Sequence, residues 1–214
     1  MTPPRDLAAR AGHRLATGVI HTVWRPRVLG AWRVPATGPA ILAVNHTHNV
    51  DGPVLFGTAP RPVRFLVKRE AFVGPLGAFL NVIGQLSVDR SGPDRAAVTA
   101  ALAVLDGGEV LGIFPEGTRT TGDFAALRAG LAYFAVRSGA PIVPVAVLGS
   151  GGRGGRAVRA LPPPRVRIDV VFGEPFHAGD SSGRRTRAAL DAATRGIQER
   201  LTDHLKDARR RTGR

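Results

Sequence analysis

The sequence of 214 residues contains no cysteine. Without thiols the chain forms no disulfide and offers no thiolate, so thiol-based redox roles and cysteine nucleophiles are excluded. It also lacks an apolar run near the ~20 residues needed to cross a bilayer, since the longest, around residues 76–86, contains Asn81 and Gln85. The first thirty residues carry several arginines without a central apolar stretch. We therefore expect neither a membrane span nor a cleavable secretion signal, and a chain that stays on the cytoplasmic side.

Acidic residues are scarce. Sixteen of them face 30 basic residues, which leaves a net charge of +14, and all the basic residues except Lys68 and Lys206 are arginine. Such a chain attracts phosphates, carried by nucleic acid, by an anionic membrane leaflet or by phosphorylated substrates. A biased genomic base composition also produces many arginines, alanines and glycines, so charge alone does not choose among these partners.

Short apolar segments alternate with helical patterns from residue 41 onward, which predicts a single α/β domain over residues 1–214. Because these segments are apolar throughout, we expect a mixed, mostly parallel sheet flanked by helices. The predicted strands are 41–44, 63–67, 85–88, 110–114, 142–148 and 166–172. The predicted helices are 53–60, 69–82, 94–106 and 123–138, with a basic C-terminal helix over 183–211 after a catalytic core over 40–175.

Residues 1–28 are expected to form a basic amphipathic helix. Leu15, Val19, Ile20 and Val23 recur at helical spacing, and the arginines lie largely on another face. A helix of this kind, followed by Trp24 and Trp32, can lie among lipid headgroups. The alternative is a helix that packs against its own domain.

A dense polar cluster, residues 45–53, follows the first core strand, and open α/β sheets bind ligands at such carboxyl ends. On a regular helix His46 and Asp51 would point roughly 140° apart, so they need a turn to meet. Gly52 and Pro53 favour one. A carboxylate on one ring nitrogen would fix the imidazole tautomer and make the other nitrogen a better base. Asp51 could equally cap the following helix.

A metal site is a second interpretation of this cluster, because His46, His48 and Asp51 resemble part of a hydrolase centre. The other histidines stand in terminal or loop-like positions. A second group of ligands is therefore hard to assemble, and we predict no metal.

A second polar segment, residues 114–120, reads Phe-Pro-Glu-Gly-Thr-Arg-Thr directly after another predicted strand. Pro115 and Gly117 favour a tight turn, where backbone amides, Glu116 and Arg119 can face a ligand that carries a phosphate and a hydroxyl. An ordinary charged turn is the simpler alternative.

Together these residues resemble the glycerolipid acyltransferase family, which includes lysophosphatidic acid acyltransferases. Asn45 and His46, with Asp51 after four intervening residues, match its His-x4-Asp motif, and residues 114–119 match its third block. Lys68 with Glu70, Pro75 with Gly77, and Gly84 with Arg90 resemble its second block, and residues 141–145 resemble its fourth. The blocks occur in family order over residues 40–175.

The resemblance implies that His46 is a general base oriented by Asp51, with no cofactor. It implies an acyl thioester donor, either acyl-coenzyme A or acyl carrier protein, and 1-acyl-glycerol-3-phosphate as the acceptor that becomes phosphatidic acid. By the same resemblance, the substrate-binding residues are Lys68, Arg90, Glu116, Gly117, Thr118, Arg119 and Pro144. One departure stands out, because His48 occupies a position where the family commonly has a small hydroxyl residue.

Other assignments stay open. Glycerol-3-phosphate or another lysolipid would suit the same chemistry as an acceptor. We expect a peripheral or monotopic protein on an anionic membrane surface, and no nucleic acid partner. A non-enzymatic lipid-binding or nucleic-acid-binding protein would explain the charge, although not the ordered blocks.

Overall fold

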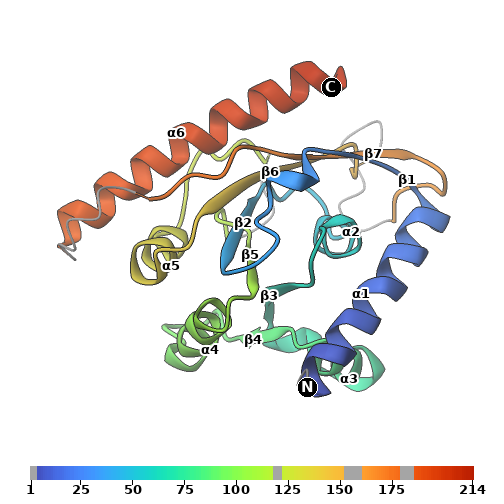
Figure 1. Cartoon of the computed structure of the whole chain (residues 1–214), viewed down its shortest axis with the longest axis horizontal. Coiled ribbons are helices and arrows are strands. Elements are labelled where there is room, and N and C mark those ends of the chain that lie inside the picture. The colour runs from blue at the N-terminus through green and yellow to red at the C-terminus, as the bar shows by residue number, and fades with distance from the viewer. Residues whose placement is uncertain (1–3, 118–121, 152–160, 179–185) are drawn as a thin grey trace.

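In the computed structural model, which describes residues 4–117, 122–151, 161–178 and 186–214, a seven-stranded sheet forms the centre (Figure 1). In sheet order its strands are β1 (Arg25–Leu29), β7 (Arg167–Phe172), β6 (Ile142–Leu148), β2 (Ala40–Val44), β5 (Val110–Ile113), β3 (Val63–Lys68) and β4 (Leu86–Val88). Strands β2 to β6 run parallel to one another, and β7 is antiparallel to β6. The predicted α/β fold with a mixed, mostly parallel sheet is confirmed.

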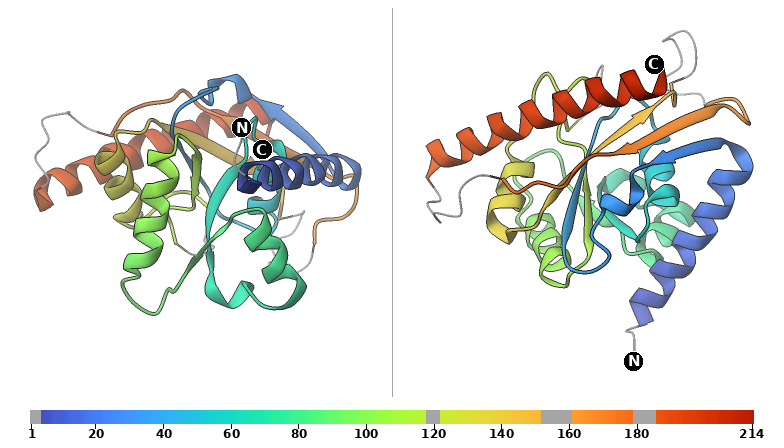
Figure 2. Two further views of the ribbon diagram at one scale, coloured as in Figure 1. Left: turned by 60° about the horizontal axis from the view of Figure 1, so that its bottom comes forward. Right: turned by 45° about the horizontal axis from the view of Figure 1, so that its top comes forward.

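Helices cover both faces of this sheet, and the right-hand view of Figure 2 shows α1 and α6 on opposite sides. One face carries α1 (Pro4–Val23), α2 (Asp51–Thr58) and α3 (Gly74–Val82) over one apolar core cluster. The other face carries α4 (Arg95–Asp106), α5 (Gly130–Ser138) and α6 (Arg187–Thr212) over a second cluster. Burial on both faces explains why the central strands are apolar at every position.

The parallel strands β2 to β6 end together at one edge, which we call the carboxyl edge. Strands β1 and β7 run the opposite way, so they begin at this edge, where Asp169 of β7 pairs in register with Leu148 at the end of β6. The segments after β2 and β5, where the sequence places its polar clusters, therefore meet at the carboxyl edge.

Several predicted boundaries differ from the structure. Strand β1 was not predicted, because Arg25, Pro26 and Arg27 give it little apolar character. The helix predicted from residue 123 begins at Gly130, and the helix predicted from residue 69 is the short 3-10 turn η2 (Arg69–Ala71) followed by α3. A second 3-10 turn, η1 (Ala31–Arg33), follows β1.

Asp169 ties the two ends of the chain together. Its fully buried carboxylate accepts hydrogen bonds from Arg27 on β1 at 2.7 Å and from Arg214 at 3.2 Å, and it forms an ion pair with Arg167, two residues before it, at 3.3 Å. A buried carboxylate is stable when it is paired in this way, so three cations hold one anion at the edge of the sheet.

Helix α1 is partly a core element. Ile20 is buried, and Trp24, just after the helix, is only 7% exposed and donates its indole N–H to the carbonyl of Pro162 at 3.1 Å. Trp24 therefore belongs to the core and is not available to lipid, whereas Trp32 is 81% exposed. Within the described parts of the chain, no helix has the length and apolar character required to cross a bilayer.

Candidate active site

His46 and Asp51 meet at the carboxyl edge. The chain turns between β2 and α2, and Asp51 is the first residue of α2. Its Oδ2 lies 3.2 Å from Nδ1 of His46 and also accepts the backbone amides of Thr47 at 2.8 Å and His48 at 2.7 Å. The predicted turn and contact are thus present, and the carboxylate organises the turn as well as the imidazole.

The two members of the pair differ in exposure. Asp51 is fully buried, while 20% of the His46 side chain is exposed. An ionised carboxylate can only accept, so the contact favours the tautomer with the proton on Nδ1 of His46. The lone pair then lies on Nε2, on the far side of the ring. The pair has the geometry of an oriented general base.

Asp51 Oδ1 is buried and has no hydrogen-bond partner among the described residues. One oxygen of the carboxylate therefore carries all three contacts. The negative charge is held close to Nδ1 of His46, and neighbouring backbone dipoles stabilise it.

Aromatic rings support the imidazole from one side. The rings of His46 and Phe114 lie 4.2 Å apart between centroids, and Phe114 in turn stacks on Phe65 at 5.7 Å. Because Phe114 lies against the core, the His46 ring has a fixed apolar surface beneath it.

Asn45 fixes the start of the turn. Its side chain donates to the carbonyl of Val147 at 3.1 Å and accepts the amide of the same residue at 2.7 Å. The side-chain amide of Asn45 thus extends the hydrogen-bonded pairing of β2 with β6 beyond the end of β2. The sequence shows Asn45 as part of the motif, but its bidentate contact depends on a strand about a hundred residues away.

Glu116 lies beneath the same turn and is 7% exposed. Its Oε2 accepts the backbone amide of His46 at 3.3 Å, and its Oε1 accepts the amide of Phe124 at 3.0 Å. The carboxylate links the end of β2 to the segment before α5. Phe124 adopts a left-handed φ of 60°, a strained conformation that this contact helps to hold.

Arg90 and Gly117 come together although they belong to different sequence blocks. A guanidinium N–H of Arg90 donates to the carbonyl of Gly117 at 3.1 Å. Gly117 has a φ of 73°, which favours glycine, and a Cβ there would displace the Arg128 side chain, whose Nε lies against this position. Arg90 and Arg128 therefore both lie beside Gly117, and we call them the cationic region. The sequence analysis did not identify Arg128.

The turn that presents Arg90 is held by two carboxylates. Asp89 accepts from the Ser91 hydroxyl at 2.6 Å, and this bond keeps the pKa of Asp89 below its ordinary value. Asp94 caps α4 by accepting the amide of Ala97 and also accepts the amide of Asp89, which lowers the pKa of Asp94. Both remain ionised at neutral pH.

The remaining predicted residues lie at different distances from the edge. Lys68 is exposed at the end of β3 and so reaches the carboxyl edge. Pro144 is buried inside β6, in register with Ala43 of β2, and does not reach it. Thr118 and Arg119 lie outside the described residues.

His48 is buried beside His46 and Asp51, and its Nδ1 accepts the amide of Val50 at 3.4 Å. The His48 ring therefore stabilises the turn between β2 and α2.

Across the described residues, no group of three or more histidine, aspartate and glutamate side chains could hold a metal ion.

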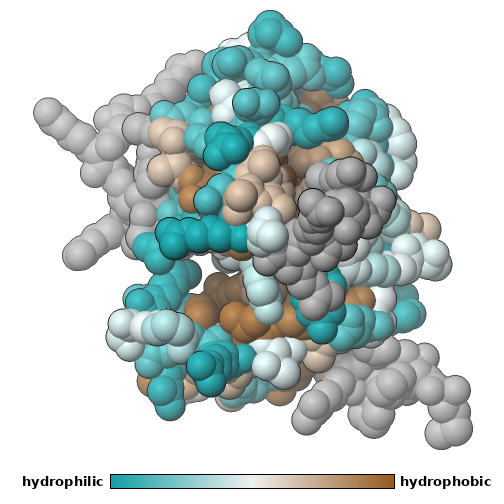
Figure 3. Space-filling model, turned by 90° about the vertical axis from the view of Figure 1, so that its left-hand side faces the viewer, coloured by the Kyte–Doolittle hydropathy of each residue, from teal (hydrophilic) through white to brown (hydrophobic). Residues whose placement is uncertain are grey.

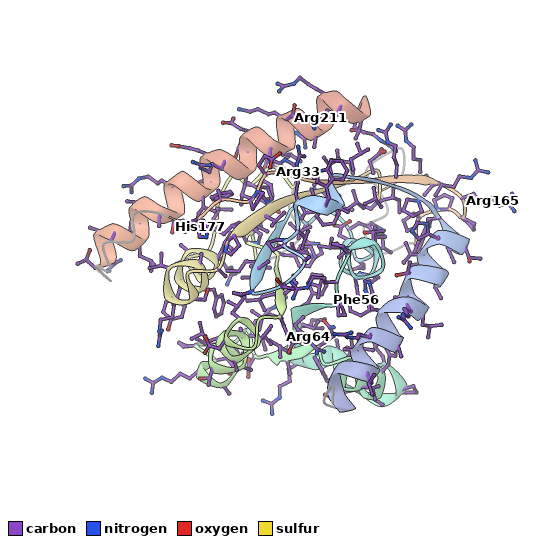
Figure 4. The ribbon with its side chains drawn as sticks, viewed as in Figure 1. Arg33, Phe56, Arg64, Arg165, His177 and Arg211 are labelled. Carbon is purple, nitrogen blue, oxygen red and sulfur yellow. The ribbon has the colours of Figure 1, made fainter. Side chains whose placement is uncertain are left out.

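Other parts of the second sequence block support the architecture. A Cβ on Gly84 would overlap the guanidinium of Arg64, which is buried and bound to Glu109 at 2.7 Å. A Cβ on Gly77 would lie 2.3 Å from the backbone of Phe72. These glycines allow close packing around α3, and Figure 4 shows Arg64, from the start of β3, near α4 and β4.

Figure 3 views the side of the molecule that carries α4 and α5, and it shows a hollow with an apolar floor. Partly buried apolar side chains of α4 and β4, including Leu86, Val98 and Leu102, pack against the second core cluster.

Comparisons with known proteins agree with one another. The sequence matches the model of the family described as Acyltransferase over residues 25–148. It is 29% identical over 179 residues to a 1-acyl-sn-glycerol-3-phosphate acyltransferase of Bacillus subtilis (strain 168), which covers 83% of this chain and 86% of that protein. A protein of the same name from Cocos nucifera is 28% identical over 177 residues, covering 80% of this chain and 55% of the relative.

The fold is also similar to a solved structure, the 1-acyl-sn-glycerophosphate (LPA) acyltransferase PlsC from Thermotoga maritima. The TM-score is 0.68 at 19% sequence identity, and the match covers 94% of this chain and 81% of that chain.

Proposed function

The chain belongs to the Acyltransferase family, and we propose that it transfers a fatty acyl group from an acyl thioester to the free hydroxyl of 1-acyl-glycerol-3-phosphate, which gives phosphatidic acid. The observation that carries the chemistry is the His46–Asp51 contact at the carboxyl edge. The names of the relatives from Bacillus subtilis and Cocos nucifera support the choice of acceptor.

In the proposed reaction Nε2 of His46 takes the proton of the acceptor hydroxyl while its oxygen attacks the thioester carbonyl. The tetrahedral intermediate then collapses, the new ester forms, and the thiolate leaves with the proton carried by the imidazolium. Asp51 stabilises that imidazolium across the 3.2 Å contact. The attacking nucleophile is the substrate itself, so the mechanism needs no cofactor and no covalent acyl-enzyme.

We assign the phosphate of the acceptor to the cationic region beside this pair. Arg90, in contact with Gly117, and Lys68 at the end of β3 lie at the carboxyl edge; Thr118 and Arg119 extend the same segment in sequence. Guanidinium groups bind phosphates in bidentate fashion, which favours Arg90 and Arg119 as the main contacts. Glu116 holds the two segments together, and the buried Pro144 acts on the site through β6.

The donor is an acyl thioester of coenzyme A or of an acyl carrier protein, and glycerol-3-phosphate is the alternative acceptor. Both substrates of the main proposal carry fatty chains. We therefore place the enzyme at the surface of a membrane as a peripheral protein.

The test is thiol release from acyl-coenzyme A in the presence of lysophosphatidic acid. His46→Ala should reduce turnover at least 100-fold, since a positioned general base contributes about 10²–10⁴-fold. His177→Ala, which changes an exposed histidine away from the site, is the matched control and should behave as wild type (Figure 4). Turnover retained by a folded His46→Ala protein would disprove the mechanism.

A further inference from the structure

Helix α1 has two apolar stripes, and the protein covers only one of them. The inner stripe packs on α2 and the sheet through Ile20 and Trp24. The outer stripe contains Leu7, Leu15 and Val19, which are 60%, 63% and 49% exposed. At 100° per residue these three positions fall on one side of the helix. The outer stripe also carries a shallow groove lined by Leu15, Gly18, Val19 and Val23, with Arg14 at its rim.

Helix α3 is apolar and stands largely in solvent. Its nine residues include no charged side chain, and Gly77 is the one that is buried. Leu76, Phe79 and Val82 are 57%, 42% and 59% exposed, and Val73, which precedes the helix, is 68% exposed. Exposed apolar patches of this kind mark sites of interaction in stable proteins.

The two helices adjoin, as Figure 1 shows, and both reach the carboxyl edge. Gly12 of α1 packs directly on Ile83 at the end of α3, where a Cβ would lie 2.4 Å from the Ile83 side chain. Helix α1 ends next to the start of β1, and α3 follows the end of β3 after η2. The C-terminal end of α1 and the N-terminal end of α3 therefore lie at the edge that carries His46.

Positive charge borders this apolar surface. Arg10 and Arg14 lie beside the outer stripe of α1 and are exposed, and residues 7–23 include no acidic side chain. Lys68 and Arg69 are exposed just before α3; Glu70 follows them in sequence, and Asp89 lies 3.8 Å from the Arg69 guanidinium. An apolar surface with a cationic border is complementary to an anionic bilayer, in which acyl chains lie beneath phosphates.

We propose that the surface formed by Leu7, Leu15, Val19, Val73, Leu76, Phe79 and Val82, called here the α1/α3 face, docks the protein onto an anionic phospholipid bilayer. The inference rests on the proposed function, because a lipid acceptor resides in that bilayer. It assigns membrane contact to α3 as well as to the N-terminal helix. Docking through this face would bring the carboxyl edge close to the lipid surface.

The partly buried side chains between α3 and the site support this orientation. Leu80 of α3, Val67 of β3 and Phe114 all lie against the same core cluster, and Phe114 contacts the His46 ring. The interior between α3 and the imidazole is therefore lined by apolar side chains that belong to one core cluster.

Point variants test this face better than a truncation, because deletion of residues 1–28 would also remove β1, Ile20 and Trp24 from the fold. Leu76→Ser with Phe79→Ser alters α3, and Leu15→Ser with Val19→Ser alters α1. The matched control is Tyr133→Ser with Val136→Ser, which changes exposed apolar residues of α5 on the other face of the sheet; these are 40% and 37% exposed.

Binding is measured by co-sedimentation with vesicles of phosphatidylcholine and phosphatidylglycerol. Each helix variant should lose at least about tenfold in partitioning, since two large apolar side chains no longer enter the bilayer. The α5 control should bind as wild type. Arg10→Gln with Arg14→Gln should weaken binding roughly tenfold to these vesicles and little to pure phosphatidylcholine.

Three results would overturn the proposal. The first is wild-type vesicle binding by both helix variants, and the second is an equal loss of binding in the α5 control. The third is a wild-type dimer in sedimentation equilibrium that the α3 variant converts to a monomer, because the face would then serve a second copy of the chain.

Acylation of a dispersed short-chain lysophosphatidic acid, without vesicles, separates this proposal from the proposed function. The helix variants should retain wild-type rates on that acceptor. If the wild-type protein does not acylate it or any vesicle-bound acceptor, the proposed function fails, while the vesicle-binding comparison still decides the α1/α3 face.

Discussion

Replacing Asp51 by asparagine removes one negative charge and almost no volume. The side-chain oxygen of asparagine can still accept from the amides of Thr47 and His48, as Asp51 Oδ2 does now. The new NH₂ group takes the place of Oδ1, which is buried without a partner. The variant therefore keeps the turn while it removes the charge next to His46.

The expected loss of rate follows from the contact distance. At 3.2 Å and an effective dielectric constant of about 20, the carboxylate and the imidazolium attract each other by about 5 kcal/mol. The exposed fifth of His46 and the backbone amides on Oδ2 reduce this value, so we take about 3–5 kcal/mol. Since each 1.36 kcal/mol is a factor of ten, kcat should fall by roughly 10²–10⁴. The buried, unpaired NH₂ should cost about 1–3 kcal/mol of stability.

The assay compares kcat and KM for thiol release with the thermal midpoint of each protein. Leu205→Ala is the control, because it opens a cavity under α6, on the sheet face away from α2, and should destabilise by about 2–5 kcal/mol without changing kcat. A folded Asp51→Asn protein with kcat within threefold of wild type would refute the electrostatic role of Asp51.

Two further predictions follow from buried groups. Glu116→Gln should lower kcat about 10–100-fold and change the KM for the acceptor less than threefold. The variant loses one charge-assisted hydrogen bond to a backbone amide, and the turn that carries His46 therefore shifts. A raised KM at unchanged kcat would instead show that Glu116 contacts the acceptor. Burial lowers the pKa of His204 below 6.5, so the folded state favours neutral His204, and the thermal midpoint should fall as pH drops from 7.5 through 6.5 to 5. His204→Gln can still donate to the Val171 carbonyl and should show a shallower decline; an unchanged slope would contradict this assignment.

Much of the fold was predictable, because its signal is local. The strand predicted at 142–148 coincides with β6, and the one predicted at 110–114 differs from β5 by one residue. These strands are buried on both faces, which leaves a continuous apolar run in the sequence. Strand β1 escaped prediction because an edge strand needs less burial, and its partner β7 lies about 140 residues away.

The start of α5 shows a different limit. Residues 122–129 do not continue the predicted helix because Phe124 turns into the left-handed region and its amide binds Glu116. That choice depends on a tertiary contact, which no helical periodicity reports. A strained residue of this kind is more common at functional sites than elsewhere.

Within the candidate site, the pairing of His46 with Asp51 was implied by the family resemblance, and their spacing required a turn between them, which the structure contains. The contacts of Glu116 were not predictable, since its partners are backbone amides of residues 70 and 8 positions away. Backbone groups have no signature in a sequence. Arg128 was also unpredictable, because it approaches Gly117 through the fold alone.

The position of Asp169 bears on how the sheet folds. Strand β1 pairs with β7, whose residues lie about 140 positions later in the sequence. The carboxylate of Asp169 binds Arg27 from one of these strands and Arg214 from beyond α6. Contacts between positions so far apart in sequence close long loops, and loop closure has an entropic cost that must be met before the contact is gained. This edge of the sheet is therefore expected to form late in folding, after the parallel strands in the middle of the sheet have paired.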